Sequence, residues 1–72
     1  MNTRLTKEDQ AIIKKARRNK CSGPIYSEDG LRLLRVLGNP EFVEVEDGVK
    51  AICDYAFQGL VYLRDVVLPA SV

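Results

Sequence analysis

The side chains that could act as nucleophiles in this chain are three serines and two cysteines. The sequence holds no histidine to serve as a base, and no lysine stands beside Ser22, Ser27 or Ser71 in a nucleophile motif. The spacing of Cys21 and Cys53 matches no zinc-binding pattern. We therefore expect no catalytic residue, no metal site and no enzyme.

The remaining polar residues indicate no cofactor. The adjacent acids Glu28-Asp29 and Glu46-Asp47 fall in predicted turns, where carboxylates satisfy nearby backbone groups. The glycines are isolated from one another, which excludes the usual phosphate-binding loop. The two cysteines are expected to be reduced and structural, with a disulfide as the alternative if the protein is exported.

Charge is distributed unevenly along the chain. Residues 1–20 carry seven Lys or Arg against two acids, a net charge of +5, and residues 21–72 carry four against eight, a net charge of −4. The cations form a basic patch of Lys14, Lys15, Arg17, Arg18 and Lys20. This patch could hold an acidic partner or nucleic acid, although no DNA-binding motif or aromatic stacking pair accompanies it and we do not favour nucleic acid. It could instead dock on an acidic strand of this chain or of a neighbouring one, made of Glu41, Glu44, Glu46 and Asp47.

The chain has the length of a single small domain, residues 1–72, whose N-terminal part is a helix followed by a hairpin. Thr6 and Asp9 have the spacing of a capping box, and Gly23-Pro24 prevents continuation, so the pattern predicts a helix over about residues 7–20. The predicted helical segment is 1–22. Asp29-Gly30 between two apolar runs predicts a tight turn in a hairpin within 23–41.

The C-terminal part, residues 42–72, contains an internal repeat. Val43-x-Val45-x-x-x-Val49 recurs as Val66-x-Leu68-x-x-x-Val72 at a spacing of 23 residues, which is in the length range of leucine-rich repeats. Residues 42–46 alternate between apolar and acidic side chains and predict a strand, and residues 65–68 predict another. The segment 54–57 between them predicts one helical turn, with Tyr55 partly buried.

This part of the chain also resembles a known family. Ile52-Cys53-Asp54-Tyr55-Ala56-Phe57, followed by Leu63-Arg64-Asp65-Val66-Val67-Leu68-Pro69, is similar to the unit of BspA-type leucine-rich repeats of bacterial surface proteins. The family's unit has Ile-Gly-x-x-Ala-Phe followed by Leu-x-x-Ile-x-Leu-Pro, and Cys53 stands here at its glycine position. The resemblance covers residues 42–72, as one repeat and the start of a second.

Together, repeat and resemblance predict an α+β fold in which the helix and hairpin cap a short, truncated leucine-rich-repeat solenoid with neighbouring parallel strands. The predicted core of the repeat is Val43, Val45, Val49, Ile52, Ala56, Phe57, Leu60, Leu63, Val66 and Leu68. The helix and hairpin are expected to cover its N-terminal side through Ile12, Ile13, Leu31, Leu33 and Leu34.

The function that follows is protein–protein interaction. The resemblance implies a secreted or cell-surface adhesion-type setting in a bacterium, although no signal peptide or membrane-spanning run occurs in the sequence. Candidate partner-binding residues are Glu44, Glu46, Tyr62 and Arg64. Because nothing remains to cover the last strand, we also expect self-association through the C-terminal edge. The alternative function is a small intracellular protein that binds an acidic partner or nucleic acid through its basic helix.

Overall fold

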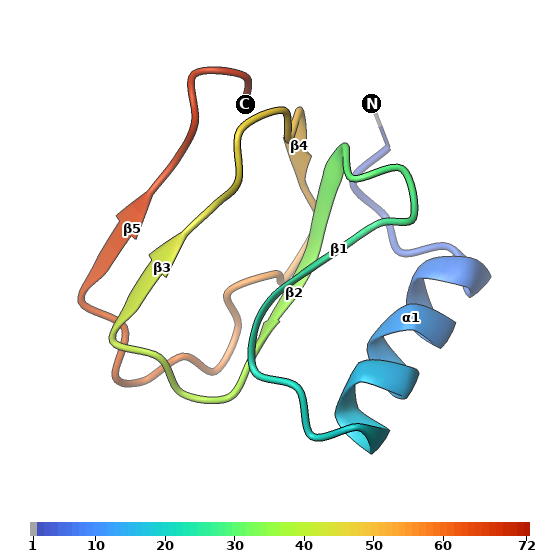
Figure 1. Ribbon diagram of the computed structural model, residues 1–72, viewed down its shortest axis with the longest axis horizontal. Coiled ribbons are helices and arrows are strands. Elements are labelled where there is room, and N and C mark those ends of the chain that lie inside the picture. The colour runs from blue at the N-terminus through green and yellow to red at the C-terminus, as the bar shows by residue number, and fades with distance from the viewer. Residues whose placement is uncertain (1) are drawn as a thin grey trace.

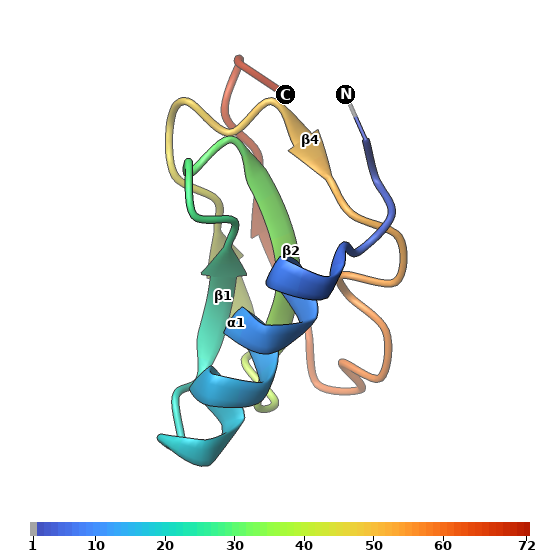
Figure 2. The same cartoon turned by 90° about the vertical axis from the view of Figure 1, so that its right-hand side faces the viewer.

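The computed structural model describes residues 2–72, with one helix and five strands in two small sheets (Figure 1). In chain order the elements are α1 (Lys7–Arg18), β1 (Gly23–Tyr26), β2 (Arg32–Leu37), β3 (Phe42–Glu44), β4 (Ala51–Ile52) and β5 (Asp65–Val67). The larger sheet has the strand order β1-β2-β4, and β3 pairs with β5 in the smaller one. Figure 2 shows α1 lying across β1 and β2.

The capping box predicted at the start of the helix is confirmed. The Thr6 hydroxyl accepts a hydrogen bond from the Asp9 N–H (3.1 Å), and the Asp9 carboxylate accepts one from the Thr6 N–H (2.9 Å). The helix ends two residues earlier than predicted, at Arg18, because Lys20 adopts a left-handed φ of 56°. That turn lets the Cys21 N–H donate to the Ala16 carbonyl (2.9 Å) and satisfies the end of the helix.

The predicted hairpin is also confirmed. β1 and β2 are antiparallel, and Gly30 takes a positive φ of 74° in the turn between them. On the other side of β2, β4 runs parallel to it, with Leu33 opposite Ile52. Ile13 and Ala16 of α1 are buried in one cluster with Leu34, Leu37 and Cys53.

The parallel pairing expected from the repeat is present in the smaller sheet. β3 and β5 run parallel in register, with Val43 opposite Val66. The face of β3 that carries Val43 packs in a second buried cluster, which contains Leu33, Val36, Val43, Val45, Val49 and Ala56.

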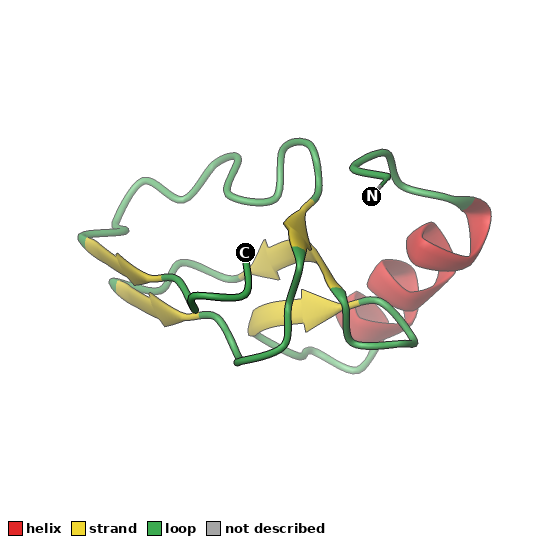
Figure 3. Ribbon diagram, turned by 90° about the horizontal axis from the view of Figure 1, so that it is seen from above, coloured by secondary structure: helices red, strands yellow, loops and turns green. Residues whose placement is uncertain are grey.

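The truncated leucine-rich-repeat solenoid is nevertheless wrong. A solenoid stacks the strands of successive repeats in one continuous sheet, whereas the two parallel pairs here lie in separate sheets, β2 with β4 and β3 with β5. Figure 3 shows the helix and the β3–β5 sheet at opposite ends of one body. The radius of gyration of 11.4 Å matches the value of about 11 Å for a compact domain of this length. The fold is a small compact α+β domain with mixed and parallel sheets.

Two details of the predicted packing are wrong as well. Tyr55, expected to be partly buried, is 71% exposed, because it sits at a left-handed φ of 62° in the turn that replaces the predicted helical segment. Val66 and Leu68, expected in the core, are 40% and 50% exposed, since no element of residues 2–72 packs over β5. Of the other predicted core residues, Val43, Val45, Val49 and Ala56 are buried, and Ile52, Phe57, Leu60 and Leu63 are partly buried against the same cluster.

The predicted cap residues come from α1, from β2 and from the turn before β2. Ile13, Leu33 and Leu34 are buried, whereas Ile12 and Leu31 are partly exposed. Leu33 points into the cluster around Val43 and Leu34 into the cluster under α1. β2 therefore lies between the two clusters and contributes side chains to both.

Candidate functional site

The most exposed apolar part of the molecule is the edge strand β5 and its surroundings. We use the name β5 edge for Val66, Val67 and Leu68 together with Phe42 of β3, all of which are exposed. Phe42 lies opposite Asp65 in the parallel register, so it shares one face of the small sheet with Val67, while Val66 and Leu68 lie on the other face. Val61 and Tyr62, which precede β5, and Val72, which follows it, are also exposed. Exposed apolar side chains gathered at a sheet edge commonly mark an interaction site.

The backbone of β5 has one paired side and one open side. The Asp65 N–H donates to the Glu41 carbonyl (3.2 Å), and the Val67 carbonyl accepts from the Val45 N–H (3.0 Å). Asp65 and Val67 therefore direct their backbone groups at β3. In a parallel ladder the intervening residue points the other way, so the N–H and C=O of Val66 face the open side.

The four residues predicted to bind a partner are all on the surface but do not form one cluster. Glu44 lies on β3 opposite Val67, and Arg64 directly precedes β5, so these two flank the β5 edge. Tyr62 lies in the turn before them. Glu46 belongs to the region of β1, because its N–H donates to the Tyr26 hydroxyl (3.1 Å). Their role in binding stays a prediction.

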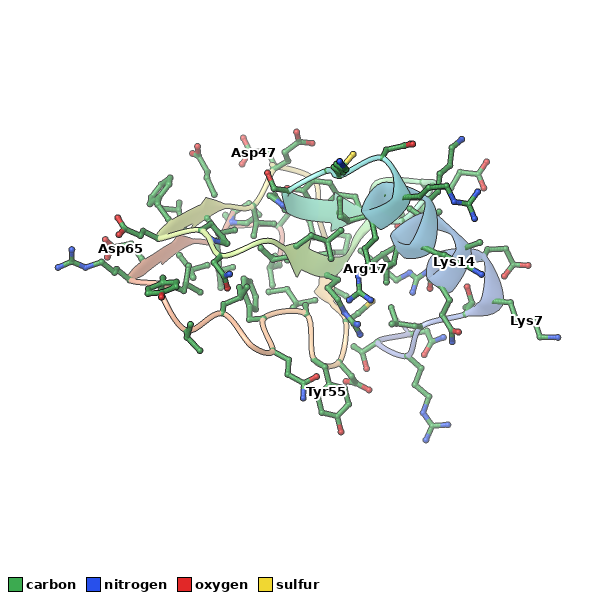
Figure 4. The ribbon with its side chains drawn as sticks, turned by 90° about the horizontal axis from the view of Figure 1, so that it is seen from below. Lys7, Lys14, Arg17, Asp47, Tyr55 and Asp65 are labelled. Atoms are coloured by element: carbon green, nitrogen blue, oxygen red, sulfur yellow. The ribbon has the colours of Figure 1, made fainter. Side chains whose placement is uncertain are left out.

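The predicted basic patch is divided between two flanks of α1. Lys14 and Arg17 line one hollow together with Arg35 of β2, whereas Lys15 lines another beside Ile25 and Tyr26. Arg18 and Lys20 are exposed. Figure 4 shows Lys14 and Arg17 close together on the helix and Asp65 at the far end of the molecule. The helix of this chain therefore does not dock on its own acidic strand β3.

Sequence reasoning missed an ion pair that joins α1 to β2. The Arg32 guanidinium contacts the Asp9 carboxylate at 2.8 Å, and Asp9 is 2% exposed. Burial alone would raise the pKa of Asp9, but hydrogen bonds from the Thr6 backbone and from Arg32 outweigh it and hold that pKa below its ordinary value. The hydrogen bond to Asp9 raises the pKa of Arg32 in turn. We assign this ion pair a structural role, because each charged group is neutralised by the other and the contact links α1 to β2.

The two cysteines are free and differ in environment. Cys21 is exposed, and Cys53 is buried with its Sγ 3.7 Å from Arg32 Nη1. Burial raises the pKa of the Cys53 thiol, which favours the unreactive protonated form. Cys21 and Cys53 do not form a disulfide with each other in this structure.

Two further observations limit the chemistry of the described part of the chain. Within residues 2–72, no three Cys, Asp or Glu side chains gather in a way that could hold a metal ion. No helix among the same residues has the length and apolar character needed to cross a bilayer.

Comparison of the chain with protein-family models, with curated proteins and with solved structures gives no match.

Proposed function

We propose that this chain is a protein–protein interaction module that binds an extended segment of a partner protein along the open side of β5. The observation that carries the proposal is the combination, on one strand, of exposed apolar side chains and unpaired backbone groups. Sheet edges with both features accept an additional strand, in which backbone hydrogen bonds supply affinity and alternate side chains supply specificity.

The chemistry of β5 defines the partner segment. Val66 and Leu68 project on one side of the sheet and Val67 on the other, since side chains alternate along a strand. A partner strand with apolar residues at alternate positions would continue the row that Val43 and Val66 begin. The exposed carboxylate of Asp65 at the start of β5 favours a basic residue at the matching end of that segment.

The edge lacks the features that usually protect such strands. Protected edges carry lysines or inward-pointing charges, and β5 contains only the acid Asp65. Pro69 follows shortly after the strand and has no N–H to donate, so it limits the partner to a short pairing over residues 65–68.

Amide hydrogen exchange can test this mode of binding at single residues. The probe is a synthetic peptide of alternating valine and threonine with lysine at both ends, titrated into the wild-type chain. Strand addition should slow exchange at the Val66 amide, which faces the open side, and leave the Val67 amide unchanged, because it faces β3. Equal protection of both amides, or none at either, would contradict the proposal.

A charge variant and a dilution series separate the possible occupants of the edge. Val66→Lys should abolish the protection, and Tyr55→Lys, the same charge placed at a more exposed site in another turn, should preserve it. If the wild-type mass rises with concentration while Val66→Lys stays monomeric, the occupant is a second copy and not a different protein.

The alternative function, binding of an acidic partner or nucleic acid through the basic helix, predicts a different response to salt. Its association would weaken steeply as salt rises, whereas association through β5 would change little. The division of the basic patch between two flanks of α1 favours the β5 edge.

A further inference from the structure

A hollow between α1, β2 and the turn after β4 has the composition of an anion-binding site. Its volume is about 430 Å³, and it is lined by Arg17, Cys21, Arg35, Val36, Leu37, Gly38, Gln58, Gly59 and Leu60. Of the lining residues, Val36 and Leu37 are buried, whereas Arg17, Gln58 and Gly59 are exposed. An adjoining hollow shares Arg17 and Arg35 and adds Gln10 and Lys14. Both hollows contain no carboxylate.

Arg17 and Arg35 line this hollow, and Lys14 lines the adjoining one, without a counter-charge in either. Across residues 2–72, the one ion pair within 4.0 Å is Asp9–Arg32, so Lys14, Arg17 and Arg35 have no carboxylate partner in the described chain. Arg17 and Arg35 come from different elements and line the same space. Like charges brought together by a fold repel one another, and a bound anion would remove that repulsion.

Arg35 supplies a second observation that points to a ligand. Its Nε is buried and makes no hydrogen bond within residues 2–72. Buried donors are nearly always paired, so this nitrogen carries an uncompensated cost. Because protein atoms enclose Nε, a ligand would contact Arg35 through the part of its side chain that lines the hollow. Arg35 stands in β2 opposite Ile25 of β1, so the strand holds its backbone in place.

The other walls are held in place as well. Gln10, Lys14 and Arg17 follow one another at spacings of four and three residues, which places them on one stripe of α1. The buried Ile13 fixes that stripe against the sheet. On the opposite side, the Val36 N–H donates to the Ala56 carbonyl (2.9 Å) and fastens the turn that carries Gln58 and Gly59. The cationic groups are thus presented by rigid elements.

We propose that this hollow binds a phosphate group carried by a small molecule. Arginine presents a planar fork of donors that fits two phosphate oxygens at once, and two arginines can hold one group from two sides. The volume lies within the range of small-molecule pockets, about 300–1,000 Å³, and exceeds the need of a bare ion, so the amide of Gln58 and the other lining residues would contact the rest of the ligand.

Chemical-shift titration of the wild-type chain tests the site directly. The probes are O-phosphoserine and inorganic phosphate, each added at constant ionic strength with sodium chloride as the balancing salt. O-phosphoserine should produce saturable shifts at the Arg35 side-chain Nε–H and at the Gly38 and Gly59 amides. Tighter binding of O-phosphoserine than of inorganic phosphate supports a carried phosphate. Equal binding of the two overturns that part, and the absence of any saturable shift overturns the site.

Charge variants distinguish the site from general attraction to a basic surface. Arg17→Gln and Arg35→Gln should each weaken O-phosphoserine binding about tenfold, the loss expected for one charged hydrogen-bonding group. Arg18→Gln removes the same charge from the same helix outside the hollow and should keep the affinity within about twofold. Equal weakening by Arg17→Gln and Arg18→Gln would overturn the proposal. Because Arg17 is exposed, its variant keeps the test valid even if Arg35→Gln fails to fold.

Discussion

Removal of the Arg32 guanidinium should destabilise this domain more than any other single loss of charge. Arg32→Met deletes the group that contacts Asp9 at 2.8 Å and leaves a carboxylate that is 2% exposed without its cation. Breaking one partner of a buried pair costs about 3–5 kcal/mol. The free energy of unfolding for 72 residues is about 4–11 kcal/mol, so the variant should lose roughly a quarter of the total or more.

The pH dependence of unfolding gives an independent check. Asp9 has a lower pKa in the folded chain than its ordinary value of 3.8. Its contribution to stability is therefore fully present above 3.8 and is lost as the pH falls through the lower folded value. Arg32→Met removes a cause of the lowered pKa, so the variant should lose less stability than the wild type on acidification below pH 4.

Urea unfolding followed by circular dichroism measures both effects. The double variant Asp9→Asn with Arg32→Met should regain at least about 2 kcal/mol relative to Arg32→Met alone, because no buried charge remains unpaired and the amide oxygen can still accept from the Thr6 N–H. Arg64→Met, which removes an exposed arginine, should change the free energy of unfolding by less than about 0.5 kcal/mol. A loss below about 1 kcal/mol for Arg32→Met, with an unchanged pH profile, would refute the assignment of Asp9–Arg32 as the link between helix and sheet.

Three further outcomes follow from local geometry. Leu33→Ala should cost about 2–5 kcal/mol in the same urea assay, because Leu33 is fully buried where the two clusters meet, and a cost near zero would contradict that placement. Lys20→Gly should raise the free energy of unfolding by roughly 1 kcal/mol, because glycine adopts the left-handed φ of 56° without strain. A loss of stability would show that the Lys20 side chain stabilises the fold by more than the strain costs. A thiol reagent at neutral pH should modify Cys21 quickly and Cys53 only on unfolding, because Cys53 is buried and burial raises its pKa. Equal modification rates, measured by mass spectrometry, would place Cys53 at the surface.

The elements that rest on short-range chemistry could be predicted from the sequence. Thr6 and Asp9 are three residues apart and form reciprocal hydrogen bonds that depend only on the local backbone. The start of α1 was therefore predicted correctly. Asp29-Gly30 determined the hairpin in the same way. The repeat of Val43 at Val66 correctly predicted two parallel neighbours, because equivalent apolar rows pair in register.

The features that depend on long-range packing could not be predicted. A spacing of 23 residues between equivalent strands does not determine whether they join one continuous sheet, and β4 pairs with β2 instead. Tyr55 was misplaced because its turn takes a left-handed backbone that directs the ring into solvent. Arg35 went unnoticed, although a cation inside the apolar run 33–37 was a visible signal that something polar must lie beside that strand.

The two parallel strand pairs of this fold interlock along the chain. β3 lies between β2 and β4 in sequence, and β4 lies between β3 and β5, so the two loops that the pairings close overlap at residues 45–50. Formation of either pairing shortens the search for the other, which couples them into one cooperative step. A single proteolytic cut within residues 45–50 would open both loops at once, whereas a cut within residues 53–64 would open one and leave the other joined.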